Sequence, residues 1–224
     1  MCGRFALTHS PAQVRSHFGY AETPDFPPRY NIAPTQPVAL VASAPFTRGA
    51  ERSFMLARWG LLPAFVKEPY PLLINARGDG VLERPSFAPA FRRRRCLVPA
   101  SGYYMFADRK PYHVSGVDGA PLAFAGLYET FLHASGSEMD TVCIITTEAN
   151  ALLAGIGERM PAILPPEAFA RWLDHETTKL EAAHALLHPA PERLLQATPV
   201  ARAVNDARKE GPQLQEPVGP ALRA

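Results

Sequence analysis

The sequence predicts a mixed, strand-rich fold with a few short helices. Its 24 prolines and 15 glycines divide 224 residues into short segments, a pattern that disfavours both a helix bundle and a regular alternation of strands and helices. Apolar residues make up 47% of the chain and charged residues 20%, which is enough to build one sizeable core. We find no repeat and no linker between domains, so we expect one domain.

The expected elements follow in chain order. Ser10 and Pro11 resemble an N-cap followed by proline at the first helical position, and Val14 and Phe18 then share one face, so a helix is expected over residues 11–18. Short segments rich in β-branched, aromatic or apolar residues are expected to form strands at 38–42, 54–58, 112–115, 122–127 and 141–146. Later helices are expected over residues 148–153, 166–173 and 177–187.

The C-terminal stretch is expected to be loose, because it is rich in Pro, Gly and Gln from residue 209 onward. This prediction places the domain at residues 1–215 and a loose tail at residues 216–224.

Composition also restricts location and chemistry. The N-terminus lacks the features of a secretory signal and the chain lacks an apolar run long enough to cross a bilayer, so a cytoplasmic monomer without a membrane partner is expected. The three cysteines, Cys2, Cys96 and Cys143, are odd in number and form no CxxC pair, which predicts free thiols and no metal or other cofactor.

A net charge of +2 is too small for a protein that coats nucleic acid. Any nucleic-acid site must be local, although the run of residues 92–95, all Arg, is by itself more typical of a solvated face.

Cys2 has the most distinctive chemistry. Once the initiator Met is removed, Cys2 carries a free α-amine and a thiol on adjacent carbons, and both are nucleophiles near neutral pH. An aldehyde forms an imine with such an amine, after which the thiol attacks the same carbon and closes a five-membered thiazolidine ring. Gly3 permits close backbone approach to a ligand and Arg4 could meet a phosphate. The alternative interpretation of Cys2 is a small buried thiol.

Short blocks in a fixed order extend this pattern through nearly the whole chain. Residues 1–5 read MCGRF, and the further blocks are RYNIAPT at 29–35, WGLLP at 59–63, NAR at 75–77, RCLVPA at 95–100, AGLYE at 125–129, TTEAN at 146–150, RMPAIL at 159–164, VN at 204–205 and EGP at 210–212. Together they resemble the signature blocks of the SRAP (SOS-response-associated peptidase) family of abasic-site-processing proteins.

This resemblance implies a fold and a function. It implies a single α+β domain with a bifurcated, barrel-like, mainly antiparallel β-sheet flanked by helices. The implied function is to bind single-stranded DNA at an abasic site, whose ring-opened sugar exposes an aldehyde, and to form a DNA–protein cross-link through Cys2. The word peptidase in the family name refers to self-removal of the initiator Met.

The resemblance also implies roles for individual residues. Cys2 would act with Asn75, which matches a family Asn that holds the sugar or the Cys2 amine by hydrogen bonds. Recognition of a nucleotide without a base depends on phosphates and on stacking with its neighbours. The residues that match family DNA-binding positions are Arg4, Arg77 and Arg159 for phosphates and Trp59 and Pro63 for neighbouring bases, with Phe65 as an addition. Without the resemblance, core packing would be the preferred role of Trp59.

Two positions depart from the family pattern. Met105 stands where the family has a Glu thought to act as general acid and base, and Gly157 stands where it has a His. Neither residue can move a proton. Glu158, Asp108 and Glu129 are the carboxylates near these blocks, and each is more typical of a surface charge than of a replacement base.

Three hypotheses therefore remain open. The first is an abasic-site processor that cross-links DNA through Cys2, with impaired acid–base catalysis. The second is a degenerate SRAP module that binds single-stranded DNA without covalent chemistry. The third, which the spacing supports least, is a thiol hydrolase that uses Cys96 or Cys143 with one of the histidines at 9, 17, 113, 133, 175, 184 and 188.

Overall fold

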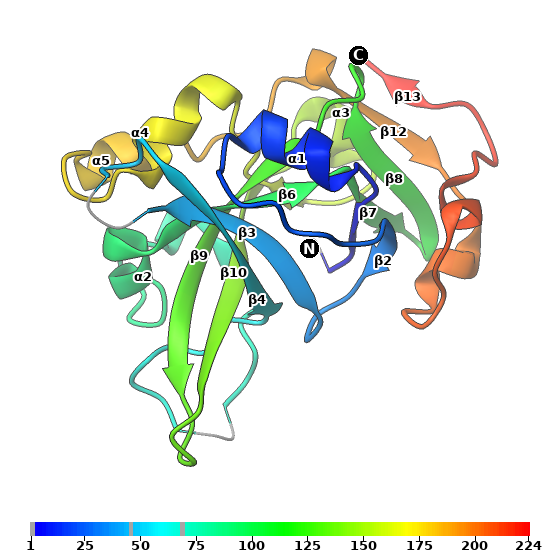
Figure 1. Cartoon of the computed structure of the whole chain (residues 1–224). Helices are drawn as coiled ribbons and strands as arrows, with labels where there is room; N and C mark the ends of the chain where they lie inside the picture. Colours follow the sequence, from blue (N-terminus) through cyan, green and yellow to red (C-terminus); the bar gives the residue numbers. More distant parts are fainter. Residues whose placement is uncertain (1–2, 45–46, 68–69) are drawn as a thin grey trace.

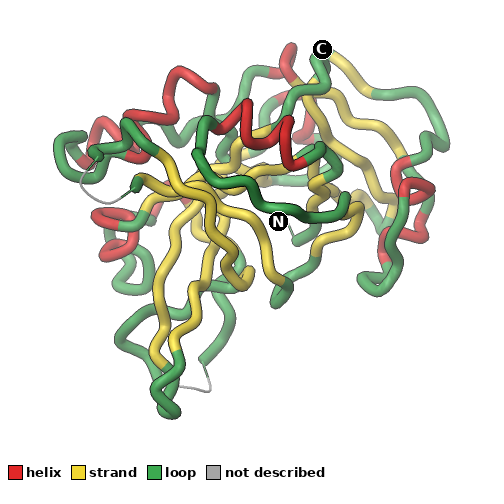
Figure 2. The backbone as a smooth tube through the Cα atoms, viewed as in Figure 1, coloured by secondary structure: helices red, strands yellow, loops and turns green. Residues whose placement is uncertain are grey.

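The computed structural model describes residues 3–44, 47–67 and 70–224, and strands form most of its regular structure (Figures 1 and 2). The fold is a single α+β domain, as expected. The strands are β1 (Phe5–Leu7), β2 (Arg29–Ile32), β3 (Pro37–Ser43), β4 (Arg52–Trp59), β5 (Asn75–Arg77), β6 (Arg95–Ala100), β7 (Gly102–Ala107), β8 (Lys110–Gly116), β9 (Leu122–Leu132), β10 (Glu138–Glu148), β11 (Arg159–Pro161), β12 (Leu195–Pro199) and β13 (Leu222–Arg223). The α-helices are α1 (Pro11–Phe18), α2 (Ala88–Arg93), α3 (Ala151–Ala154), α4 (Phe169–Leu173) and α5 (Leu180–His184).

Five of the described strands close into a small barrel in the order β10, β4, β3, β6 and β9. Closure is possible because the long strand β9 pairs with β6 through its first half and with β10 through its second half. At the crossover, a Cβ on Gly126 would lie 2.9 Å from Cys96 Sγ, so only glycine fits there without a shift. The β9–β10 hairpin extends beyond the barrel, next to the chain segment that connects β4 to β5 (Figure 1).

A second sheet leaves the barrel where β6 ends. Its order is β13, β12, β8, β7, β1 and β2, with antiparallel neighbours. Ser101 is the only residue between β6 and β7, and its Oγ accepts hydrogen bonds from the backbone N–H groups of Thr8 at 2.7 Å and His9 at 3.1 Å. The Ser101 hydroxyl therefore holds the connection between β1 and α1 at the point where the sheet divides. The division of the sheet into a barrel and a second sheet is the expected bifurcated architecture.

An aromatic cluster joins the two sheets. The Phe5 ring from β1 lies 5.1 Å from Trp59 of β4 and 5.9 Å from Phe124 of β9, and Tyr103 of β7 lies 5.7 Å from Phe124. These ring pairs are edge-to-face, the arrangement favoured by aromatic quadrupoles, and all four residues are buried. The first strand of the chain is thereby held between the barrel and the second sheet.

Helices cover the outside of the strands (Figure 2). Helix α1 begins as expected, with Ser10 as its N-cap and a capping box completed by Gln13, and ends at Gly19 in the left-handed conformation. Its Phe18 stacks on Phe169 of α4 with 5.5 Å between ring centroids. Among the described residues, no helix is long and apolar enough to span a bilayer.

The expected elements are present with changed boundaries. All five expected strands form and all are longer than expected, because pairing extends them past the local pattern. The expected helix at 148–153 is shorter, since Glu148 belongs to β10 and Asn150 caps α3. The helix at 177–187 is reduced to α5. The helix at 166–173 forms as a 3-10 turn over Pro166–Ala168 followed by α4.

The prediction of a loose C-terminal tail was wrong. Leu214 is fully buried, Val218 N donates to Pro199 O at 2.9 Å, and β13 pairs with β12 through Gln196 and Arg223. Proline, glycine and glutamine disfavour long helices and strands, but they permit an ordered chain that adds one edge strand to a sheet already present. The domain therefore extends through residues 216–224.

Substitution of Gly102 by Ala is expected to destabilise the fold. A Cβ at this position would lie 2.6 Å from Val114 O and 2.3 Å from His113 Nε2, so the β7–β8 pairing at the branch point would have to shift, at a cost of about 1–3 kcal/mol. Chemical denaturation measures this loss. Gly155→Ala is the matched control, because a Cβ there meets nothing within 4 Å; equal midpoints for both variants would contradict the prediction.

Candidate DNA-binding and catalytic site

Strand β10 brings together three of the predicted site residues. It pairs in parallel with β5, so that Ile144 lies opposite Asn75 and Thr146 opposite Arg77. It also pairs with β11, which places Glu148 opposite Arg159. Asn75 and Arg77 are two residues apart on one strand and therefore face the same side. The C-terminal end of β10 thus gathers residues that are far apart in the sequence.

Arg77 and Arg159 share one carboxylate. Arg77 donates two hydrogen bonds to Asp79, from Nη2 to Oδ2 at 2.6 Å and from Nε to Oδ1 at 3.1 Å, and Arg159 Nη2 lies 3.9 Å from Asp79 Oδ1. The hydrogen bond from Arg77 lowers the pKa of Asp79 to about 2, so the carboxylate is ionised at neutral pH. This arrangement is a charged cluster with one anion between two cations.

Arg159 is held from behind by β10. Its Nη2 donates to Thr146 O at 2.5 Å and its Nε to Thr146 Oγ1 at 3.3 Å. Partial burial lowers the pKa of Arg159, yet an arginine stays charged at neutral pH. The guanidinium is therefore pre-positioned, and its side chain is only 12% exposed compared with 56% for Arg77.

Arg4 directly precedes β1, a strand of the second sheet. Its carbonyl accepts a hydrogen bond from Tyr104 N at 3.0 Å, so it lies opposite the residue before Met105. Its guanidinium donates to Asn31 Oδ1 at 2.8 Å and to Val204 O at 2.9 Å. Partial burial lowers the pKa of Arg4, while the nearby Asp206 acts in the opposite direction. Arg4 thus also links the chain start to the C-terminal segment.

Met105 and Gly157, the two positions that depart from the family pattern, are neighbours in space. A Cβ built on Gly157 would lie 3.1 Å from Met105 Cε. Met105 is buried on β7, with 6% of its surface exposed, and Gly157 follows α3 with its N–H donating to Leu153 O at 3.1 Å. The thioether therefore borders the space that a side chain at residue 157 would enter. Arg159 follows Gly157 by two residues and therefore connects this contact with the charged cluster.

The proposed stacking role of Trp59 needs correction. Trp59 is 0% exposed, its Nε1 donates to Ile74 O at 2.9 Å, and its ring packs on Phe5. A base cannot reach this ring, so Trp59 is a core residue that holds the segment before β5. The chain turns directly after the ring at Gly60, which has a φ of 129° that favours glycine.

The loop after β4 nevertheless offers an aromatic surface. Phe65 is 63% exposed and lies with the buried Pro63 at the edge of a depression of about 260 Å³, which Pro85, Pro89 and Glu129 complete. An exposed phenyl ring is suited to stacking on a nucleobase. Phe65 is therefore a better stacking candidate than Trp59.

The arginine run at 92–95 does not form a phosphate track. Arg92 and Arg93 are exposed, and Arg94 Nε lies 3.4 Å from Glu129 Oε2. Arg95 is 1% exposed, and it donates to the carbonyl oxygens of Phe91, Trp172 and Asp174. Burial lowers the pKa of Arg95 to about 10, and the residue anchors α4 on the barrel.

Three carboxylates lie near the family blocks in the sequence, and their surroundings differ. Glu129 is buried on β9, where desolvation raises its pKa and Arg94 acts against that effect. Asp108 lies in the β7–β8 turn at φ 49°. Glu158 is exposed and directly follows Gly157, so it is the nearest of the three in the chain.

The structure argues against the thiol-hydrolase hypothesis. Cys96 and Cys143 are fully buried, and desolvation raises the pKa of both thiols. A buried neutral thiol is a poor nucleophile. Cys2 lies outside the described residues. Within the described part of the chain, no group of three or more His, Cys, Asp or Glu residues is arranged to hold a metal ion.

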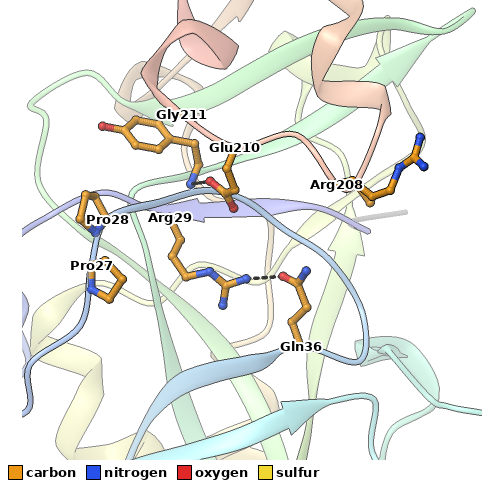
Figure 3. A pocket seen from close by; sticks show the side chains of 9 residues that line it. Pro27, Pro28, Arg29, Gln36, Arg208, Glu210 and Gly211 are labelled. Carbon is orange, nitrogen blue, oxygen red and sulfur yellow. Dashed lines mark hydrogen bonds between the residues drawn. The ribbon is translucent and has the colours of Figure 1, made fainter.

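An open groove of about 540 Å³ borders the Arg4 region on the side of β2 and the C-terminal segment (Figure 3). Glu210 forms one wall, and its carboxylate accepts hydrogen bonds from Tyr30 N at 2.8 Å and Asn31 N at 3.3 Å. Across the groove, the Arg29 guanidinium donates to the Gln36 side chain and to Pro37 O. The C-terminal segment thereby satisfies backbone donors on the edge strand β2.

Comparison with known proteins confirms the family. The profile of the family described as SOS response associated peptidase (SRAP) matches residues 1–207. The chain belongs to the SRAP family. It is 32% identical to abasic site processing protein YoqW of Bacillus subtilis (strain 168), over 96% of this chain and 99% of that protein. It is 29% identical to abasic site processing protein HMCES of Xenopus tropicalis, over 100% of this SRAP chain and 82% of that protein.

Solved structures agree with the SRAP fold. A crystal structure of a Bacteroides thetaiotaomicron protein superposes with a TM-score of 0.83 at 24% identity and covers 96% of this chain and 99% of its own. A phage-related protein of Bordetella bronchiseptica superposes with a TM-score of 0.69 at 27% identity, over 89% of this chain and 94% of its own. The barrel with an attached antiparallel sheet is therefore shared with experimentally determined structures.

Two residues that contact the candidate site arginines were missed in the sequence. Asp79 follows Arg77 by two positions and lies between Gly78 and Gly80. An acid flanked by glycines, close to a predicted phosphate contact, was the signal available in the sequence. Asn31 lies in the block at 29–35, yet its contact with Arg4 joins residues 27 apart and has no local signature. Side-chain contacts of this kind depend on strand order, which the sequence pattern leaves open.

Thiol labelling should distinguish the cysteines. We expect iodoacetamide at about pH 8 to leave Cys96 and Cys143 unmodified in the folded protein, because both are buried as neutral thiols, and to modify both in urea. Peptide mapping by mass spectrometry gives the result for each residue. Rapid modification of Cys96 or Cys143 in folded protein would contradict the burial and reopen the hydrolase hypothesis.

Proposed function

We propose that this SRAP protein binds single-stranded DNA at abasic sites and, after removal of Met1, forms a thiazolidine cross-link through Cys2. Asn75 orients the opened sugar or the Cys2 amine, and Arg4, Arg77 and Arg159 bind phosphates. Phe65 and the Pro63 loop contact bases beside the lesion.

The observation that carries this proposal is the convergence of distant family positions on one place. Met105 contacts the space at Gly157, Arg159 follows Gly157 and shares Asp79 with Arg77, and Arg77 stands beside Asn75 on β5. The Arg4 carbonyl pairs with Tyr104 N, and Tyr104 is the residue before Met105.

The chemistry needs protons to move without the usual family groups. Attack of the Cys2 amine on the aldehyde gives a carbinolamine, loss of water gives the imine, and addition of sulfur to the imine carbon closes the ring, with one water released overall. At residues 105 and 157 a buried thioether and a bare backbone replace the carboxyl and the imidazole. Water must carry these protons, so we propose slow cross-linking that depends on long residence of the aldehyde near Cys2.

A second candidate function is binding of single-stranded DNA without covalent chemistry. The packing of Met105 toward Gly157 favours it, because this contact leaves an apolar surface where the family has proton carriers. The two functions share the arginines and differ only in the reaction of Cys2. Intact-mass measurement shows whether Met1 has been removed. This decides whether the reaction can occur, since an attached Met1 blocks the α-amine of Cys2.

Covalent capture is expected to require Cys2. Met-free protein, incubated with uracil-containing single-stranded DNA after glycosylase treatment, should give a heat-stable band of low mobility that Cys2→Ala abolishes. Cys143→Ala serves as the control, because that buried thiol should not affect capture. If Met-free protein binds the DNA but yields no such band after long incubation, the non-covalent function is correct.

Restoring the family residues is expected to accelerate cross-linking. General acid–base groups contribute on the order of 100- to 10,000-fold to rate, so Met105→Glu/Gly157→His should form the cross-link at least about 100-fold faster than the natural sequence. Both changes are needed together, because a side chain at residue 157 enters the space that Met105 Cε borders. Time courses on denaturing gels measure the rates, and circular dichroism confirms folding. A folded double variant with an unchanged rate would refute the assignment of these positions.

A further inference from the structure

Asp79 occupies the place between the two arginines at which a phosphate would be expected. Its carboxylate takes two parallel hydrogen bonds from Arg77, at 2.6 and 3.1 Å, and lies 3.9 Å from Arg159. Arginine binds carboxylate and phosphate with the same fork of N–H donors. Asp79 therefore takes the Nε–Nη2 edge of Arg77, and a DNA phosphate can bind this edge only by displacing the carboxylate.

The surroundings add further negative charge. Glu148 lies opposite Arg159 in the β10–β11 pairing, and both Glu148 and Glu158 are exposed acids that stabilise the charged form of Arg77. Arg77 and Arg159 thus stand near three carboxylates, and Arg84 approaches the same turn, with its Nε 3.5 Å from the position of a Cβ on Gly80. The three acids offset part of the positive charge that would attract a DNA backbone.

The turn that carries Asp79 is fixed in place. Residues Gly78–Gly80 form a 3-10 turn directly after β5, and His184 Nε2 donates to Gly78 O at 2.9 Å from α5. A Cβ on Gly78 would meet Thr146 O at 3.4 Å, which shows how closely the turn packs on β10. The backbone is held on both sides, while the Asp79 side chain is 55% exposed and can rotate away.

We propose that Asp79 is a specificity-determining residue that competes with DNA phosphates for Arg77 and Arg159. In the DNA-free protein its carboxylate neutralises the arginines and keeps them in position. A phosphate must displace it, so binding to undamaged single strands is weakened, and stable capture depends on the additional reaction at an abasic site. This inference rests on the proposed function, because it takes the two arginines as phosphate contacts.

The test measures affinity for undamaged DNA by fluorescence anisotropy with a labelled oligothymidine probe. Asp79→Asn keeps the size of the side chain and removes its charge, and it should bind about 3- to 10-fold more tightly at ~50 mM salt, with a smaller gain at ~200 mM salt because of screening. Asp79→Glu keeps the charge and should stay near the natural affinity. Glu176→Gln is the matched control, since it removes the carboxylate of another exposed arginine pair, with Arg48 at 3.3 Å.

The outcomes separate this inference from the proposed function. Arg77→Ala is measured beside the other variants, with melting temperatures to confirm that each is folded. If Arg77→Ala weakens binding and Asp79→Asn does not strengthen it, competition by Asp79 is refuted and the proposed function stands. If Arg77→Ala leaves the affinity for DNA unchanged, the arginines are not phosphate contacts and this inference fails. Cross-linking by Cys2 is then still decided by the gel assay with abasic single-stranded DNA.

Discussion

The site depends on the position of Phe5 between the barrel and the second sheet. Its ring packs edge-to-face on Trp59 and Phe124, which belong to the barrel, while its backbone pairs with Tyr103 in the second sheet. Loss of such a buried phenyl ring costs about 3–5 kcal/mol. A residue held this strongly fixes the strand that follows the chain start, and Arg4, its neighbour, is thereby placed opposite Tyr104.

Strand pairing on β10 explains why the charged residues form a cluster. Strand β10 pairs with β5 along one stretch and with β11 at its end. Each of these two short strands carries one arginine. Because backbone pairing determines their spacing, the arginines need no contact with each other and share Asp79 instead. Their like charges would repel without it. The acidic residues therefore serve both to assemble the arginine pair and to limit its affinity for anions.

Residues 105 and 157 form a packed contact. Met105 is an adaptable apolar side chain that borders the space above Gly157, and neither residue carries a group that can transfer a proton. The relatives YoqW and HMCES are described as abasic site processing proteins. This chain retains the architecture of the family.

Local sequence determined the elements whose causes are local. The Ser10 cap with its following helix and the five apolar strand segments were predictable, because capping and side-chain alternation act within a few residues. The ordered blocks also predicted the family. Only tertiary structure decided that Trp59 is buried, that the C-terminal segment completes the second sheet, and that Asp79 lies between Arg77 and Arg159. Each of these depends on which strands become neighbours, and strand order arises from packing of the whole chain rather than from any short segment.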